Sequence, residues 1–323
     1  MRHPEYFFGK NHVNVLTDPD NLRILKPHLL CAAWELPLAA GDKSVFGKNY
    51  LDACKELETE GLLRMRRRNW YLTTAIRYPA QEINIRSTSS RDFSLVENES
   101  GRLLEKVEES RAFLQLHPGA VYLHQGDTYL VTRLDLAGLT AYAEPVAADY
   151  YTQTKDITDI RILKTLARKR AGTVNVSLGE VEVTSTVLGF RKKRIMTEEV
   201  IGEEALDLPA QSFSTVSLWF DIPGGVGEAL AAEDLGFAGG LHAAEHAGIA
   251  LLPLFALCDR NDIGGVSTPF HPETGQPQIF IYDAYPGGIG ISEKGYDLVE
   301  DLWDATLKAI SECPCREGCP GCI

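Results

Sequence analysis

Four cysteines stand within ten residues near the end of this chain, in the run CPCREGCPGC, and no other feature limits its fold as strongly. Prolines and glycines separate the cysteines, so tight turns can bring the sulfur atoms around one ion. Four thiolates suit zinc and leave no open position for catalysis. An iron–sulfur cluster is the alternative, although the spacing matches neither common ferredoxin run. We therefore predict a structural zinc site with the ligands Cys313, Cys315, Cys319 and Cys322.

The composition is that of an ordinary globular protein, with 44% hydrophobic and 24% charged residues. At roughly 100–200 residues per domain, the length predicts two or three domains. No apolar run approaches the roughly 18 residues that a membrane helix needs, and the N-terminus has no signal-peptide pattern. We expect a cytoplasmic protein with no membrane partner. In that reducing compartment cysteines serve as thiols or metal ligands rather than as disulfides.

Residues 1–80 carry the pattern of a winged helix. The turn at 18–21 predicts a helix start, and Pro27 is expected to kink or restart this helix. A second helix with one apolar face is predicted to end at Gly61. Two short strands within 62–73 then enclose a turn of arginines. Helices followed by a β-hairpin tipped with arginine are typical of a winged helix.

Alternating apolar residues from 81 to 222 predict a mostly antiparallel β region with a helix near 102–115. Glycine-containing turns predict hairpins over 121–136 and 173–188, the second turning at Gly179.

The segment after residue 223, where a further boundary can fall, changes to small residues at helical spacing over 226–257. A buried strand over 279–283 and a last amphipathic helix over 292–312 complete the pattern. The predicted fold class is α+β. It comprises a winged-helix domain, 1–80, and a second domain, 81–323, whose mostly antiparallel β region leads into a helical, zinc-binding C-terminal region.

The net charge of -13 conceals two basic segments. In the predicted wing, the candidates for nucleic-acid contact are Arg64, Arg66, Arg67, Arg68 and Trp70, with Tyr71 beside them for stacking on bases or sugars. The second segment, 161–194, holds nine basic and two acidic residues, and its candidates are Arg168, Lys169, Arg170, Arg191, Lys192, Lys193 and Arg194. A charge run is usually a solvated face, but two of them in an acidic chain favour nucleic-acid binding.

Two further motifs have both a functional and a structural interpretation. His242, Glu245 and His246 match the inverted zincin pattern H-x-x-E-H, and the alternative is a buried helix with hydrogen-bonded polar groups. The run Pro286–Gly290 lies between a strand and a helix, where backbone N–H groups can bind an anion, or it is a structural turn. Gly41–Lys48 departs from a P-loop in its spacing, so the chain has no ATPase motif.

A family resemblance follows from motifs spread in order over nearly the whole chain. They are HPEYFFG, HLLCAAWELPL, HPGAVYLHQGDTYLV, DYYTQ, HAAEHA, CDRNDIGG, IFIYDAYPGGIG and CPCREGCPGCI. The chain resembles the C-terminal half of MrfA-type DNA-repair helicases, which are DEAD/DEAH-box superfamily-2 proteins. In that family two RecA-like ATPase domains precede a winged helix and a zinc-binding domain with a four-cysteine signature.

The resemblance implies an ATP-dependent, 3′-to-5′ DNA helicase that acts in DNA repair, of which this chain is the DNA-binding part without the motor. The four tail cysteines match the family's zinc ligands. ATP and magnesium would be bound only by motor domains, supplied in cis or in trans, and alone the chain is expected to be inactive. We expect it to be a truncated chain, a split gene product or an accessory subunit. Its expected DNA partner is a single strand or a tailed duplex.

Two other functions are compatible with the residues alone. The first is a zinc hydrolase built on the HAAEH motif, in which two histidines hold the metal and the glutamate activates water. The second is a non-enzymatic, zinc-stabilised module whose acidic last third binds a basic protein.

Overall fold

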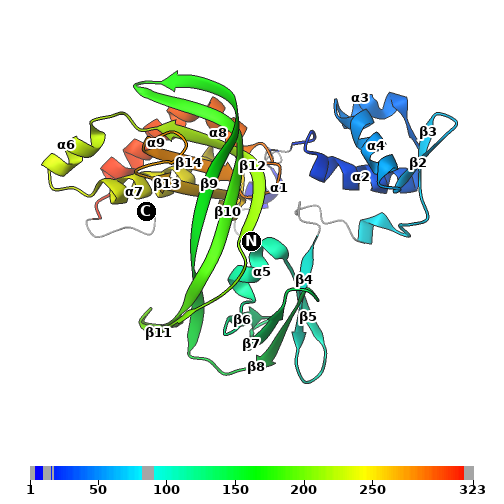
Figure 1. The fold of residues 1–323 in the computed structure, drawn as a ribbon, viewed down its shortest axis with the longest axis horizontal. Coiled ribbons are helices and arrows are strands. Elements are labelled where there is room, and N and C mark those ends of the chain that lie inside the picture. Colours follow the sequence, from blue (N-terminus) through cyan, green and yellow to red (C-terminus); the bar gives the residue numbers. More distant parts are fainter. Residues whose placement is uncertain (1–3, 10–15, 17, 82–90, 316–323) are drawn as a thin grey trace. The chain divides into compact units, whose positions relative to one another are not determined.

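The computed structural model describes residues 4–9, 16, 18–81 and 91–315 (Figure 1). The chain divides into two compact units, one formed by residues 1–83, 162–181 and 215–323 and the other by 84–161 and 182–214. Strands β9 (Tyr150–Ala171) and β10 (Val174–Arg194) contribute residues to both units, so each unit is assembled from segments distant in sequence.

The short helix α1 (Pro4–Phe8) precedes helix α2 (Leu22–Glu35), which begins where the turn predicted it. The side-chain oxygen of Asn21 caps α2 by accepting the backbone N–H of Arg23 at 2.9 Å. Helix α2 runs through Pro27 without a break, so the expected restart is wrong. A proline removes one helical hydrogen bond, and the packing of buried leucines on the same helix offsets that loss.

The winged helix is completed by a second helical layer and a small sheet. These elements are β1 (Leu38–Ala39), α3 (Lys43–Phe46), α4 (Tyr50–Thr59), β2 (Leu63–Arg66) and β3 (Asn69–Leu72). The strand order is β1-β3-β2, and β3 pairs antiparallel with both neighbours. Leu29, Tyr50, Cys54 and Leu57 lie at the centre of its core and are at most 1% exposed. The predicted winged helix is confirmed.

The second unit contains a five-stranded sheet in the order β5-β4-β8-β7-β6. Its elements are β4 (Asp92–Glu97), β5 (Leu103–Glu108), α5 (Glu109–Gln115), β6 (Val121–His124), β7 (Asp127–Asp135) and β8 (Thr140–Pro145). All neighbours are antiparallel except β4 and β8. The first half of the helix predicted near 102–115 is strand β5, in which only Val107 is buried.

Strands β9 and β10 pair as a long two-stranded ribbon that turns at Gly172, whose φ is +56°. The hairpin predicted to turn at Gly179 is therefore wrong, because β10 continues straight through that residue. A Cβ atom at Gly179 would lie 2.1 Å from the carbonyl oxygen of Lys164 and 3.0 Å from the Trp219 ring. The glycine is needed for close packing, not for a turn.

The C-terminal part extends the sheet of β10 with three antiparallel strands and covers it with helices. The sheet order is β11-β10-β12-β14-β13, with β11 (Val200–Ala205), β12 (Gln211–Asp221), β13 (Ile263–Thr268) and β14 (Gln278–Asp283). The helices are α6 (Val226–Ala232), α7 (Phe237–Leu251), α8 (Ile291–Asp297) and α9 (Val299–Glu312). The predicted last helix is thus two helices.

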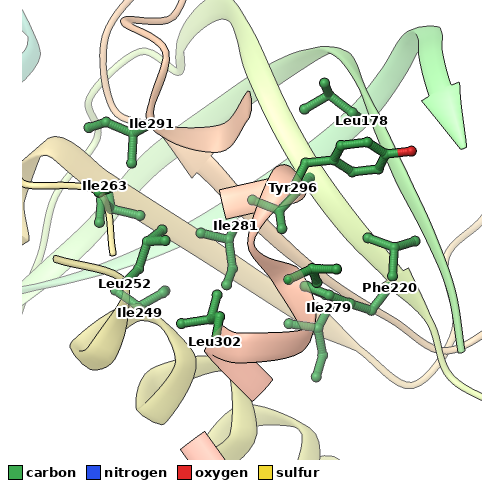
Figure 2. Close-up of a cluster of buried hydrophobic side chains, with 14 of the residues drawn as sticks. Leu178, Phe220, Ile249, Leu252, Ile263, Ile279, Ile281, Ile291, Tyr296 and Leu302 are labelled. Atoms are coloured by element: carbon green, nitrogen blue, oxygen red, sulfur yellow. The ribbon is translucent and has the colours of Figure 1, made fainter. Parts of the chain in front are cut away.

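The hydrophobic core of this part lies between the sheet and the helices (Figure 2). Ile281 of β14 is fully buried and lies close to Ile249 of α7 and Leu302 of α9 in Figure 2. Every residue of β14 is buried, as the continuous apolar run predicted. The predicted α+β class is confirmed. None of the helices within the described residues has the length and apolar character required to cross a membrane.

Candidate nucleic-acid interface and metal centres

The wing is the hairpin of β2 and β3, and its turn consists of two arginines. Arg67 and Arg68 have φ values of +47° and +71°, so both occupy the left-handed region that two-residue hairpin turns require. All four arginines of the wing are exposed. The hairpin therefore presents its guanidinium groups to solvent from a backbone that strand pairing holds in place.

The pairing register separates the wing into an outer and an inner face. Arg64 is opposite Tyr71, and Arg66 is opposite Asn69. Because side chains alternate along a strand, these four residues share one face. Tyr71 is 37% exposed and can stack on a base or sugar beside the arginines.

Trp70 belongs to the inner face of the wing, opposite Met65. Its side chain is 5% exposed and its ring centroid lies 6.2 Å from that of Tyr50 in the winged-helix core. Its indole N–H donates to the carboxylate of Glu58 at 3.3 Å. The ring is therefore inaccessible to a base, so the stacking expected of Trp70 does not fit its burial, and Tyr71 is the exposed aromatic residue of the β3 strand.

Glu58 of helix α4 supports the wing and was not singled out from the sequence. Besides the indole of Trp70, its carboxylate accepts the backbone N–H of Met65 at 3.1 Å. A sequence signal exists in retrospect, since Glu58 is a charged residue close to the end of an amphipathic helix that leads directly into the hairpin.

The charges of the two basic segments differ in how they are compensated. In the described part of the chain, no carboxylate lies within 4.0 Å of a side-chain nitrogen of Arg64, Arg66, Arg67 or Arg68. The wing thus carries four positive charges without a close counter-ion, and that arrangement favours a polyanion.

The basic run at the end of β10 is paired within its own unit. The nearest partners are Glu203 for Arg191 at 2.7 Å, Glu204 for Lys192 at 2.6 Å, Glu198 for Lys193 at 3.7 Å and Asp149 for Arg194 at 2.9 Å. Strand β11 supplies two of these four carboxylates, from Glu203 and Glu204. The pairing leaves little net positive charge at this end of the strand.

Arg168, Lys169 and Arg170 lie near the turn of the β9–β10 ribbon and are held by neutral groups. Arg168 donates to the hydroxyl of Ser177 at 3.1 Å, and Arg170 donates to a backbone carbonyl at 3.1 Å. The ammonium of Lys169 lies 4.5 Å from the centroid of the Tyr296 ring. Because these partners are uncharged, they do not neutralise the positive charges of the three side chains, although they hold the side chains in place.

The tail cysteines follow helix α9. Cys313 is half-buried and caps this helix in an extended conformation, and Cys315 is exposed. Cys319 and Cys322 lie outside the described residues. The two described thiols are separated by Pro314 in a segment that is neither helix nor strand, and that arrangement fits a zinc-binding loop at the end of a helix.

Cys258 is the fifth cysteine of the C-terminal part and an alternative thiolate ligand for the tail zinc. It is partly buried against the C-terminal core, and burial together with Asp262 raises the pKa of its thiol to about 12. The thiolate needed for zinc is therefore disfavoured at this residue, consistent with a core thiol.

The Pro286–Gly290 loop already holds an anion, which is the carboxylate of Asp283. One of its oxygens accepts the backbone N–H groups of Ile289 at 2.6 Å, Gly290 at 3.0 Å and Ile291 at 3.3 Å. Burial raises the pKa of Asp283, and hydrogen bonds from Ser292, Ile289 and Ile291 oppose the rise. The structural interpretation of this loop therefore holds, because the chain fills its own anion site.

The HAAEH motif lies on helix α7 with its three polar side chains on one face. His242, Glu245 and His246 each offer one ligand atom, and these atoms lie within 4.8 Å of one another. Glu245 is 4% exposed, whereas His242 is exposed and its Nδ1 lies 3.3 Å from the Glu245 carboxylate. The interpretation of this motif as a buried helix with hydrogen-bonded polar groups therefore does not hold for His242, whose side chain is exposed.

Comparison with known proteins places two domains on this chain. Residues 17–88 match the family model of the winged helix domain of the ATP-dependent helicase HRQ1, and residues 244–323 match that of the MrfA Zn-binding domain.

The relatives described below match this chain over its whole length and are named as helicases. The chain is 33% identical over 333 residues to an uncharacterized ATP-dependent helicase, YprA, of Bacillus subtilis, covering 100% of this chain and 43% of that protein. It is 29% identical to the ATP-dependent helicase hrq1 of Schizosaccharomyces pombe, covering 100% of this chain and 31% of that protein. The chain thus spans less than half the length of these two relatives.

Solved structures agree in fold over the whole chain. The DUF1998 helicase MrfA matches with a TM-score of 0.64 and 28% identity, covering 100% of this chain and 45% of that one. The same helicase bound to DNA matches with a TM-score of 0.58 and 32% identity, covering 100% of this chain and 43% of that one.

Proposed function

We propose that this chain binds DNA on behalf of helicase motor domains that it does not itself contain. The premise is that the chain, over its whole length, corresponds to the C-terminal part of MrfA- and Hrq1-type helicases, with their winged helix and Zn-binding domain. The complete protein would be an ATP-dependent 3′-to-5′ DNA helicase acting in DNA repair. ATP and magnesium would bind only to RecA-like motor domains. The boundary near residue 80 separates the winged helix from the rest, with a further boundary near 223.

The wing is the part of this proposal that the structure supports best. Its four arginines have no carboxylate partner within 4.0 Å among the described residues, and Tyr71 lies on the same face as Arg64 and Arg66. Guanidinium groups would contact phosphates, and the phenol ring would stack on an unpaired base. These contacts carry no base-sequence information, and so the proposal predicts binding without sequence preference.

The ribbon residues Arg168, Lys169 and Arg170 are proposed as a secondary contact. Residues 191–194 remain candidates, with a smaller expected contribution because a DNA phosphate would have to displace an existing carboxylate from each.

The structural role of zinc follows from the four tail cysteines. A closed shell of thiolates supplies folding free energy and no reactive position. Zinc would therefore hold the tail in place after helix α9 rather than take part in chemistry. We propose that Cys313, Cys315, Cys319 and Cys322 are the four ligands.

The test is the salt dependence of binding to a tailed duplex, measured with the full chain by fluorescence anisotropy. Each phosphate contact adds about 0.9 to the slope of log Kd against log salt. Replacing the four wing arginines together by glutamine should reduce that slope by about 2 to 4. A matched variant with Arg191, Lys192, Lys193 and Arg194 changed to glutamine should reduce it by less than about 1.

Three results would contradict the proposal. One is no binding at low salt, another is a flat salt dependence, and the third is an equal loss in the two variants. Directionality requires the motor, so unwinding of 3′-tailed and 5′-tailed duplexes is compared after motor domains are added. Activity on the 5′-tailed substrate alone would refute the 3′-to-5′ assignment.

A further inference from the structure

Helix α7 carries a cluster of metal-binding side chains that the proposed function does not use. His242, Glu245 and His246 stand at positions i, i+3 and i+4 of a regular helix, so all three project from one face. The two imidazole rings have centroids 4.3 Å apart and planes at 78°. Among the described residues, this is the one group of three or more His, Cys, Asp or Glu side chains whose ligand atoms converge within 4.8 Å.

Close packing of strand β13 against α7 fixes the carboxylate of this cluster. A Cβ atom at Gly265 would lie 2.5 Å from Oε1 of Glu245 and 2.4 Å from a methyl carbon of Ile249. Glycine at this position leaves room for the ends of both side chains between the strand and the helix. Glu245 is thereby held at 4% exposure with its oxygens beside the histidines.

The ring of His242 remains accessible. Its side chain is 65% exposed, and its Nδ1 is 3.3 Å from Glu245 and 3.4 Å from the hydroxyl of Ser267 on β13. Two ligand atoms on one tetrahedral zinc, each about 2.0–2.1 Å from the ion, lie roughly 3.3 Å apart. The Nδ1 of His242 and the carboxylate oxygen of Glu245 already stand at that separation, 3.3 Å. An ion approaching from solvent therefore meets an oriented imidazole before it reaches the buried carboxylate.

We propose that His242, Glu245 and His246 bind a divalent transition-metal ion on helix α7, separately from the cysteine tail. Two neutral imidazoles and one carboxylate form a donor set that suits zinc and its neighbours in the first transition row. Three protein ligands leave one tetrahedral position for water. The ion is therefore exchangeable, in contrast to an ion enclosed by four thiolates.

Helix α7 is rich in glycine, and a bound ion would stabilise it. The helix contains Gly239, Gly240 and Gly248, and each glycine lowers helix stability by about 1 kcal/mol relative to alanine. A metal that joins His242 to His246 closes one turn of this weak helix. Metal binding is thus coupled to the order of α7, which packs on β13 and β14.

The experiment titrates the full chain, purified without metal, with cobalt(II) alone. Cobalt bound by thiolates shows strong charge-transfer absorption, and cobalt bound by imidazole and carboxylate does not. The wild-type chain should bind two equivalents, the first with and the second without the thiolate absorption. The double variant His242→Ala/His246→Ala should lose only the second equivalent, whereas His28→Ala, a histidine on α2, should keep both.

Glu245→Gln keeps the shape of the buried side chain and should weaken the second equivalent about tenfold or more. The thiolate absorption of the first equivalent and the far-ultraviolet circular dichroism report whether each variant is folded. Absence of a second equivalent, or its persistence in the double histidine variant, overturns this inference. The DNA-binding proposal is judged independently, because the double histidine variant should bind tailed duplex as the wild type does.

Discussion

The carboxylate of Asp283 accepts two hydrogen bonds from Ser292, one from its backbone N–H at 2.8 Å and one from its hydroxyl at 2.7 Å. Both residues are at most 1% exposed. The other carboxylate oxygen accepts three backbone N–H groups of the preceding loop. Strand β14 is thereby joined to the start of helix α8 through a single side chain.

Replacing Asp283 by alanine should therefore destabilise the C-terminal part strongly. The hydroxyl of Ser292 keeps the carbonyl of Val216 as an acceptor, so four backbone N–H groups lose theirs. Each costs about 1–3 kcal/mol, so a loss of about 4 kcal/mol or more is expected. Urea unfolding followed by tryptophan fluorescence measures it. Asp304→Ala, at an exposed position beyond the first turn of α9, should change the free energy of unfolding by less than about 0.5 kcal/mol.

The stability of the chain should depend on the ionisation of Glu293. Burial, followed by the charge of Asp283, raises its pKa from 4.5 to about 7, and one of its oxygens has no partner among the described residues. A raised carboxyl pKa means that the folded state holds the proton more tightly than the unfolded state. This group's contribution to stability is therefore fully present below pH 4.5 and is lost as the pH rises to about 7.

Glu293→Gln imitates the protonated form and removes this dependence. The melting temperatures of wild type and variant should agree near pH 4.5, and the variant should be the more stable above pH 7. A constant difference between the two proteins at all pH values would contradict the assignment.

Gly179 should not tolerate a side chain. Alanine there would place its Cβ 2.1 Å from a backbone oxygen of β9, and overpacking of this kind costs about 1–3 kcal/mol. Gly41→Ala is the matched control, because nothing lies within 4 Å of its Cβ position and its φ is not positive. Thermal unfolding of the two variants should show a clear loss for Gly179→Ala only.

Substitution of the two aromatic residues of the wing should affect folding stability in one case and DNA binding in the other. Trp70→Ala removes a buried ring from the winged-helix core and should cost about 3–5 kcal/mol of stability. Tyr71→Ala should leave stability nearly unchanged and weaken single-strand binding by about 1–3 kcal/mol. A stable Trp70→Ala chain with reduced affinity would reverse these roles.

Removing one tail thiol should release the structural metal. Cys315→Ser leaves three thiolates and should reduce bound zinc by one equivalent in metal analysis, together with a lower melting temperature. Cys31→Ser, on helix α2, is the control and should retain the metal. Equal zinc content in the two variants would exclude Cys315 as a ligand.

Much of the fold could be predicted because local signals agreed with tertiary structure. The helix start at Asn21, the arginine hairpin and the buried strand before Asp283 each have a pattern that depends on neighbours in sequence. The order of the motifs along the chain was enough to indicate the resemblance to MrfA-type helicases, with which the matches of residues 17–88 and 244–323 agree.

The failures share a physical cause, which is contact between residues distant in sequence. Gly179 has the appearance of a turn residue, and only the approach of Lys164 on β9 explains it. Trp70 and Tyr71 are adjacent and chemically alike, and the strand register decides which is buried. Two of the four carboxylates that neutralise residues 191–194 lie on β11 and one, Asp149, precedes β9, so the neutralisation depends on how the strands pair.

The backbone amides of the Pro286–Gly290 loop are bound by the carboxylate of Asp283, and this limits how the chain would bind a polyanion. Main-chain amides that could cradle a phosphate in a fixed position are already satisfied by Asp283. Under the proposed function, a nucleic acid would be bound mainly by the long, rotatable guanidinium side chains of the exposed wing. Under the same proposal, these side chains would release one phosphate and bind the next without any rearrangement of the backbone, as contact with a moving strand requires.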